Sequence, residues 1–378
     1  MHLIDALEIH VVHSCNLTCE SCSHYSNQGH DGIVSLAEAD QWMRAWHHRV
    51  RPRTFSLLGG EPTIHPQLTD FVSGNSNVYT KNPDYWDKEK IGGQEYKLPF
   101  VDKITYRIIK DEATYVTALR TGKLDMLEAI RWQNVDSLKK SAPQLQWNRW
   151  LNQSGTFMAM RVDVDGPFKD IRVRRALNYA VNKQEIVQAY YNGNAELFSY
   201  PQHPDYVGYF EPLDKQPASV QELFKYDPAK AKKLLAEAGF PKGFTTKVQV
   251  CSCNPDHMDL LPLVAGYLEQ VGVKLEIQPM EYGAFLSAMT TKTNAAGYMM
   301  QNGHTNPTTS IRKSFVTKQT WNPSQYSDPD FDKRMAAVYL ERDESKRQLL
   351  IKLMTRDILE KAPYSIGWIS SFTPTCSR

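Results

Sequence analysis

The sequence predicts an α/β protein in which strands and helices alternate along most of the 378 residues. Short apolar segments of strand length recur between amphipathic segments of helical length. Helix start and stop signals bracket the amphipathic segments, as where Asp227 and Pro228 precede one and Gly239 follows it. A polar stretch without periodicity at residues 73–81 separates a first β-α-β segment from the remainder, so we expect at least two parts.

Residues 1–72 are expected to form the β-α-β segment. Residues 7–12 and 54–58 have the apolar pattern of strands. Between them, Ser35 and Glu38 have the spacing of a helix capping box, and the helix is expected to end before Pro52. One helix between two strands implies that the strands pair in parallel.

Beyond residue 81 the pattern predicts further strands and helices. Strands are predicted at residues 103–109, 247–251 and 273–277. Helices are predicted at residues 113–121, 170–191, 227–239, 260–271 and 343–361. Gly122 is placed to close the first of these helices, because glycine adopts the left-handed conformation common after a helix end.

Composition argues against several classes of partner. The chain has 44 basic and 42 acidic residues and a net charge of +2, which gives no reason to expect nucleic acid. It contains no run of about 18 apolar residues, so no transmembrane segment is expected. At the N-terminus, Asp5, Glu8 and His10 interrupt any apolar stretch, and no basic region precedes it, so no secretory signal is expected. The chain as written is therefore expected to stay in the cytoplasm.

Three cysteines cluster near the N-terminus. Cys15, Cys19 and Cys22 have a C-x3-C-x2-C spacing, and three thiolates on one loop can ligate three irons of a [4Fe–4S] cluster. The alternatives are three unrelated thiols or a zinc site, for which His13 or His24 could supply the fourth ligand.

The cysteine triad, followed at the end of the second strand by Gly59, Gly60, Glu61 and Pro62, resembles the radical SAM enzymes. The resemblance implies a [4Fe–4S] cluster whose open iron binds S-adenosylmethionine, with the glycine-rich turn against that cofactor. Members of that family often carry an aromatic residue just before the third cysteine, whereas this chain has Ser21 at that position. The resemblance ends near residue 72, which leaves only a fragment of the family's partial TIM barrel with unpaired strand edges. We therefore assign no catalytic residue.

The remainder of the chain carries a second resemblance, to the family 5 extracellular solute-binding proteins, the oligopeptide, dipeptide and nickel carriers of ABC importers. The matching segments, in family order, are residues 82–87, 101–111, 118–125, 170–183, 226–240 and 272–276. The resemblance implies a two-lobed periplasmic-binding-protein fold, an extracytoplasmic location, and ABC permease and ATPase subunits as partners. Residues 73–160 would form part of the first lobe. Residues 161–378 would form the second lobe and the start of a return to the first, clipped after residues 366–368.

The ligand site is expected near the end of a strand around residue 300. Peptide-binding members of the family carry an Asp-x-x-[Asp/Glu]-Pro pattern whose first Asp pairs with the peptide α-amine. Here Gly303 and Asn306 replace the two acidic residues, so peptides, nickel complexes, sugars and other small solutes all stay open as ligands. By position, the candidate ligand-binding residues are Tyr298, Gln301, Asn302 and His304.

The sequence thus favours a solute-binding component of an ABC importer, headed by a radical SAM-like fragment. One alternative is a radical SAM enzyme with a carrier-like C-terminal region, and another is a non-functional fusion. Cys251 and Cys253 are expected to be unpaired structural cysteines, with a metal site or a disulfide as the alternatives.

Overall fold

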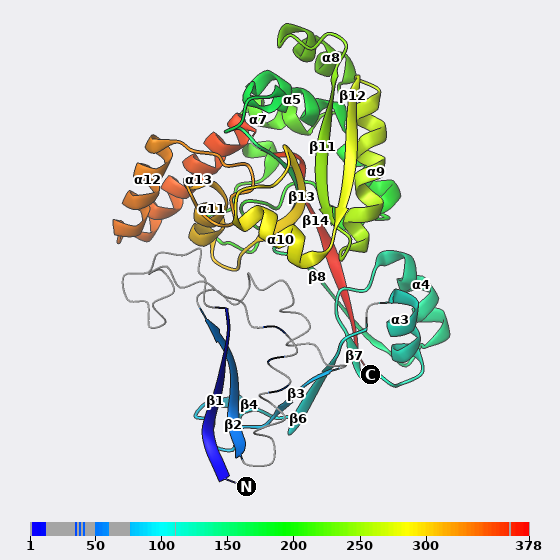
Figure 1. Cartoon of the computed structure of the whole chain (residues 1–378), viewed down its shortest axis with the longest axis vertical. Helices are drawn as coiled ribbons and strands as arrows, with labels where there is room; N and C mark the ends of the chain where they lie inside the picture. The colour runs from blue at the N-terminus through cyan, green and yellow to red at the C-terminus, as the bar shows by residue number, and fades with distance from the viewer. Residues whose placement is uncertain are drawn as a thin grey trace. The chain divides into compact units, whose positions relative to one another are not determined.

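The computed structural model describes residues 2–12, 35, 38, 41, 50–59, 76–109, 111–362 and 364–377. The chain divides into two compact units, residues 1–118 and residues 119–378 (Figure 1). The lobe boundary expected near residue 160 stays a prediction. Within the described ranges, no helix combines the length and the apolar character that a membrane crossing requires.

The first unit begins with the predicted parallel pair of strands. Strand β1 (His2–Val12) pairs with β2 (Val50–Gly59), and Val12 lies opposite Gly59. The capping box is confirmed, because the Glu38 carboxylate accepts from the Ser35 backbone N–H at 2.9 Å and Ser35 Oγ accepts from the Glu38 N–H at 3.2 Å. These bonds satisfy backbone donors that a helix start otherwise leaves unpaired, so the local pattern was sufficient to predict them.

Among its described residues, this unit also contains two antiparallel strand pairs and most of a helix. Strand β3 (Ser76–Thr80) pairs with β6 (Lys103–Arg107), which confirms the strand predicted at residues 103–109. Strands β4 (Lys88–Ile91) and β5 (Gln94–Lys97) form a hairpin closed by Gly92 and Gly93. Both glycines have positive φ, as a two-residue hairpin turn requires. Helix α3 (Glu112–Arg120) ends before Gly122 as predicted, with Gly122 at φ 77°.

The second unit is built on a mixed eight-stranded sheet. Its main strand order is β10-β14-β9-β13-β11-β12, and β7 and β8 also pair with β14. Strand β11 pairs in parallel with β12 and with β13. Strand β13 pairs antiparallel with β9 on its other side. The strand bounds are β7 Met126–Leu127, β8 Gln146–Leu151, β9 Ser154–Met160, β10 Ala195–Glu196, β11 Phe244–Cys251, β12 Val273–Met280, β13 Gly297–Gly303 and β14 Tyr364–Ser377.

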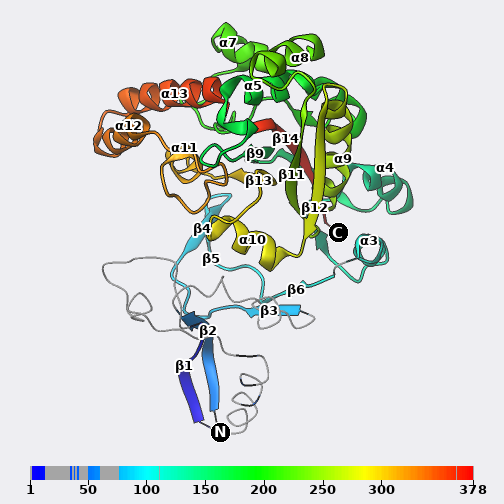
Figure 2. The same cartoon turned by 45° about the horizontal axis from the view of Figure 1, so that its top comes forward.

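Helices pack on this sheet, and α9 lies along β11 and β12 (Figure 2). The helix bounds are α4 Trp132–Ser141, η2 Pro167–Lys169, α5 Ile171–Ala180, α6 Lys183–Glu185, η3 Ile186–Tyr190, η4 Leu213–Lys215, α7 Ala218–Gln221, η5 Glu222–Phe224, α8 Pro228–Glu237, α9 Pro255–Glu269, α10 Tyr282–Thr290, α11 Pro307–Phe315, α12 Pro329–Leu340 and α13 Glu344–Lys361. Four of them, α8, α9, α11 and α12, begin with an Asp or Asn cap followed by Pro. Such a pair satisfies a free backbone N–H and pre-sets φ, so these helix starts are fixed locally.

One expectation about this unit was wrong in detail. The helix predicted over residues 170–191 breaks after Ala180, because Val181 is extended and Asn182 caps a new helix start. At the C-terminus, strand β14 runs through residues 366–368 to Ser377 and pairs with β8 and β7. The predicted return to a first lobe stays a prediction.

The expectation of unpaired cysteines at residues 251 and 253 was also wrong, because Cys251 and Cys253 form a disulfide. Strand β11 ends at Cys251, and the following turn folds Cys253 back, so that its N–H points at Cys251 Sγ at 3.2 Å. The two Cα atoms are then 5.1 Å apart, within the range that a disulfide bridges.

Candidate functional site

Strand β13 positions the residues that the sequence singled out. Tyr298 lies in its first half and is completely buried. Its hydroxyl donates to the Phe285 carbonyl oxygen at 2.6 Å, and its ring stacks on that of Phe285 with centroids 4.2 Å apart. Burial raises the pKa of this phenol. Tyr298 therefore packs in the core of the second unit and has no exposed surface there for a ligand.

Asn302, near the end of β13, joins a buried polar network. Its side-chain amide donates to Ser314 Oγ at 2.9 Å and to the Trp321 carbonyl oxygen at 3.4 Å. Ser314 Oγ also accepts from the Tyr200 hydroxyl at 2.7 Å. Three separate parts of the chain are thereby tied together at the end of this strand, since a buried network holds its members in one arrangement when it is satisfied.

Gln301 is partly buried on β13, whereas His304 follows the strand and is exposed. His304 Nδ1 accepts from the Asn306 backbone N–H at 3.0 Å. Partial desolvation, with the nearby charges of Lys313 and Arg312, lowers the pKa of this imidazole. Asn302 and His304 thus lie at the same end of β13, whereas Tyr298 is set back in the core. A ligand role for any of the four residues stays a prediction.

The loop at residues 199–206 lies against the start of α11. Ser310 Oγ donates to the Pro201 carbonyl oxygen at 2.7 Å, and Gln202 Nε2 donates to that of Pro307 at 3.1 Å. Four buried polar atoms of this loop have no hydrogen-bond partner among the described residues. They are Ser199 Oγ, Gln202 Oε1, His203 Nε2 and Tyr206 OH. Buried polar groups are nearly always paired, so this concentration marks the loop as unusual.

Two glycines allow the backbone to pack tightly beside this loop. A Cβ atom at Gly303 would overlap the Gln153 carbonyl oxygen and lie 2.6 Å from Ser154 Cα. A Cβ atom at Gly155 would lie 2.5 Å from Tyr200 Cβ. The position where peptide-binding relatives are expected to carry an aspartate is therefore one at which this backbone accommodates no side chain.

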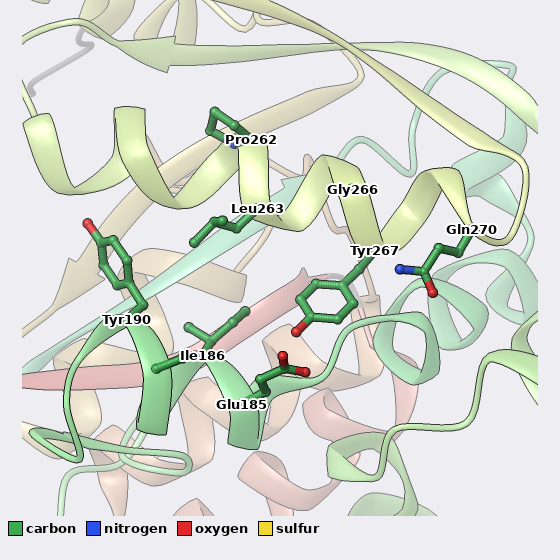
Figure 3. A pocket seen from close by; sticks show the side chains of 9 residues that line it. Glu185, Ile186, Tyr190, Pro262, Leu263, Gly266, Tyr267 and Gln270 are labelled. Carbon is green, nitrogen blue, oxygen red and sulfur yellow. The ribbon is translucent and has the colours of Figure 1, made fainter.

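A separate groove lies between η3 and α9, with a volume of about 610 Å³. Tyr267 points from α9 toward Glu185 across the groove (Figure 3). Burial, together with the Glu185 carboxylate, raises the pKa of the Tyr267 phenol. The lining residues are Glu185, Ile186, Ala189, Tyr190, Pro262, Leu263, Gly266, Tyr267 and Gln270.

The predicted cluster ligands lie outside the described residues, as do Gly60, Glu61 and Pro62. These ligands are Cys15, Cys19 and Cys22. Gly59 is the last residue of β2. Because β1 and β2 are parallel and Val12 lies opposite Gly59, the two strands end on the same side of the pair, at their carboxyl ends. Elsewhere, in the part of the chain that the structure describes, no group of three or more His, Cys, Asp or Glu side chains is placed to hold a metal ion.

Sequence reasoning did not identify the loop at residues 199–206. Its candidate residues, Gln202 and His203, stand between Pro201 and Pro204, and nothing in that short pattern indicates which distant elements they contact. Arg312 and Lys313 on α11, whose charges lie near His304, were not singled out either. The sequence does show their lack of acidic neighbours, because residues 282–327 contain no Asp or Glu.

Comparisons with known proteins agree with this architecture. The glutathione-binding protein GsiB of Pectobacterium atrosepticum is 27% identical over 328 residues, covering 83% of this chain and 61% of the relative. The chain thus spans less than two thirds of that relative's length.

Solved structures show the same fold. The DppA periplasmic binding protein of Helicobacter pylori, in complex with the peptide STSA, superposes with a TM-score of 0.66 at 23% identity, over 79% of this chain and 56% of that one. NikA from Staphylococcus aureus in complex with Ni(L-His)2 superposes with a TM-score of 0.65 at 16% identity, over 80% and 61%. The second resemblance is therefore correct at the level of an α/β binding-protein fold.

Residues 67–324 match the profile of the bacterial extracellular solute-binding proteins, family 5, middle region. The match begins upstream of the seam expected at residues 73–81 and covers more than half of the chain. The chain therefore belongs to the family 5 bacterial extracellular solute-binding proteins.

Proposed function

We propose that the chain is the solute-binding component of an ABC importer and that it holds a small peptide, a nickel complex or a similar solute at the end of β13. The observation that carries the proposal is the loop at residues 199–206, whose buried polar atoms lack partners beside the Asn302 network. Water or a polar solute could complete such hydrogen bonds. A relative named as glutathione-binding, and proteins of the same fold solved in complex with a peptide and with Ni(L-His)2, support this range of ligands.

The permease and ATPase subunits of an importer would be the partners of such a carrier. An extracytoplasmic location fits the Cys251–Cys253 disulfide, because disulfides persist mainly in oxidising compartments. Gly303 separates this carrier from peptide binders that pair an α-amine with an aspartate, since the backbone accommodates no side chain there. The solute is therefore expected to be held without that ion pair.

A ligand panel tests the proposal. The whole chain is titrated with glutathione, the peptide STSA and Ni(L-His)2, and thermal unfolding and calorimetry are recorded. A ligand at a hundred times its Kd stabilises a folded protein by about 2.7 kcal/mol, so binding is visible as a rise in Tm. If none of the three compounds shifts Tm or gives heat, the proposed function is wrong.

A matched pair of variants places the site. Gln202 and Gln216 are both buried, both donate through Nε2 to a backbone carbonyl oxygen, and both leave Oε1 without a partner among the described residues. Gln202→Ala and Gln216→Ala should cost similar stability. Only Gln202→Ala should weaken binding of the ligand found. Equal affinity in both variants would remove the 199–206 loop from the site.

We propose as a second candidate that residues 1–72 retain the cluster-binding segment of a radical SAM domain. The pairing of β1 with β2 supports this second candidate. The two strands end side by side, and the predicted thiols and the glycine-rich turn follow those ends in the sequence. Cys15, Cys19 and Cys22 would hold a [4Fe–4S] cluster, which would bind S-adenosylmethionine. Anaerobic reconstitution with iron and sulfide, followed by metal analysis and a visible spectrum, tests this against the zinc alternative. A colourless product containing stoichiometric zinc would refute it.

A further inference from the structure

The segment at residues 282–327, which includes β13, contains basic residues but no acidic ones. Residues 282–327 contain no Asp or Glu, although the whole chain has 42 acidic residues. The same segment contains Lys292, Arg312, Lys313, Lys318 and His304. It includes β13 and α11, so the excess of cations lies on the elements that build the site.

Three of these cations converge on residues 319–321, which follow α11. Arg312 Nη1 donates to Gln319 Oε1 at 2.7 Å, and Lys292 Nζ donates to the Gln319 carbonyl oxygen at 2.7 Å. Lys313 Nζ lies over the Trp321 ring, 5.5 Å from its centroid. The Trp321 carbonyl oxygen in turn accepts from Asn302, so this cationic group adjoins the buried network of β13.

Arg312 and Lys313 are adjacent cations on α11. Among the described residues, neither side chain has a carboxylate within ion-pair distance. Both are partly buried, and burial followed by the charge of Arg312 lowers the pKa of Lys313. Holding cations close together in a partly desolvated place is unfavourable unless an anion joins them. A guanidinium has five donors, which leaves Arg312 able to bind a carboxylate while it donates to Gln319.

We infer that the solute bound at this site carries an acidic group, a carboxylate or a comparable oxyanion, which Arg312 and Lys313 bind beside the Trp321 ring. This inference rests on the proposed function and names the ligand class. Charge-assisted hydrogen bonds to carboxylates are among the stronger polar contacts. An indole ring carries partial positive charge at its edge, so an anion beside the ring is favoured at the edge rather than over the face. Trp321 is 40% exposed, so its ring is available for such a contact.

The experiment compares matched ligands and matched variants of the whole chain. The probes are glutathione and glutathione with both carboxylates converted to amides, measured by calorimetry at low ionic strength. The acid form should bind about tenfold to a hundredfold more tightly than the amide. Arg312→Gln and Lys313→Gln should each remove most of that difference. Lys313→Arg should largely retain it.

Lys233→Gln on α8 serves as the control, because it removes one exposed positive charge elsewhere on the same unit. It should leave the preference for the acid form unchanged, and the Tm of each variant checks that it folds. Equal binding of the two probes, or an unchanged preference in both Gln variants, overturns the inference while leaving the proposed carrier function in place. Absence of binding by glutathione, its diamide, STSA and Ni(L-His)2 alike refutes the proposed function itself.

Discussion

Gly303 offers a quantitative test of how closely the backbone packs at the candidate site. In Gly303→Ala the added Cβ would overlap the Gln153 carbonyl oxygen and lie 2.6 Å from Ser154 Cα. Carbon atoms in contact prefer separations of about 3.5–4.0 Å, so β13 and the start of β9 would have to separate by about 1 Å. Both obstacles are backbone atoms, which cannot move aside by changing a rotamer.

The expected cost of Gly303→Ala is about 2–3 kcal/mol, toward the upper end of the range for overpacking. In a unit of this size, that cost corresponds to a fall in Tm of about 4–10 °C. Differential scanning calorimetry of the whole chain measures it. Gly303→Asp adds the same Cβ and a carboxylate, and should lower Tm further without creating a preference for peptides with a free α-amine over N-acetylated ones.

A different result would refute this reasoning. If Gly303→Ala unfolds within about 1 °C of the wild type, the close approach of Gln153 does not constrain the position. If Gly303→Asp is also stable and prefers peptides with a free α-amine, the backbone at residue 303 can hold an aspartate as it does in peptide-binding members of the family. The proposed distinction from those carriers would then be lost.

Two further predictions concern α9. A Cβ atom at Gly266 would meet no atom within 4 Å, so Gly266→Ala should stabilise the protein by about 0.5–1 kcal/mol, measured as a rise in Tm, and a fall in Tm would contradict this. His257 is buried with Nε2 3.4 Å from Thr156 Oγ1, and burial lowers its pKa to about 4. Because the folded-state pKa is depressed, its neutral form is favoured in the folded protein, and about 3 kcal/mol of stability should be lost as pH falls from about 6.5 to 4. Urea unfolding of His257→Gln should show a correspondingly weaker acid dependence, and parallel pH profiles of the two proteins would contradict the assignment.

Local sequence signals predicted those elements whose ends are fixed by a few neighbouring residues. Asp227, Pro228 and Gly239 bracket α8, and its predicted position agrees with the structure. The capping box of Ser35 and Glu38 was equally local. The break after Ala180 was missed because Val181 and Asn182 do not disturb the apolar stripe, although Asn182 is a good helix cap.

Buried strands were harder to predict than helices. Strand β13 is buried along most of its length and pairs on both sides, with β11 and β9. A strand covered on both faces shows no alternation of polar and apolar residues, so periodicity cannot define its bounds. For the same reason the burial of Tyr298 could not be predicted from the sequence, whereas in the structure its hydroxyl donates to the Phe285 carbonyl oxygen in the core.

The candidate site depends on contacts between distant segments, and that limits what the sequence can reveal about it. The resemblance located the missing acidic residue at Gly303, but it could not give a reason for its absence. The reason is geometric, because Gln153 and Ser154 occupy the space that a side chain would need, and they are 150 and 149 positions away in the chain. The cations Arg312 and Lys313 are visible in the sequence, yet their importance depends on the segment at residues 319–321 folding back beneath them. The lack of an acid at the closed position of Gly303 and the unbalanced cations nearby both make the site more positive. A carrier with such a site should select solutes by their acidic groups rather than by an amine.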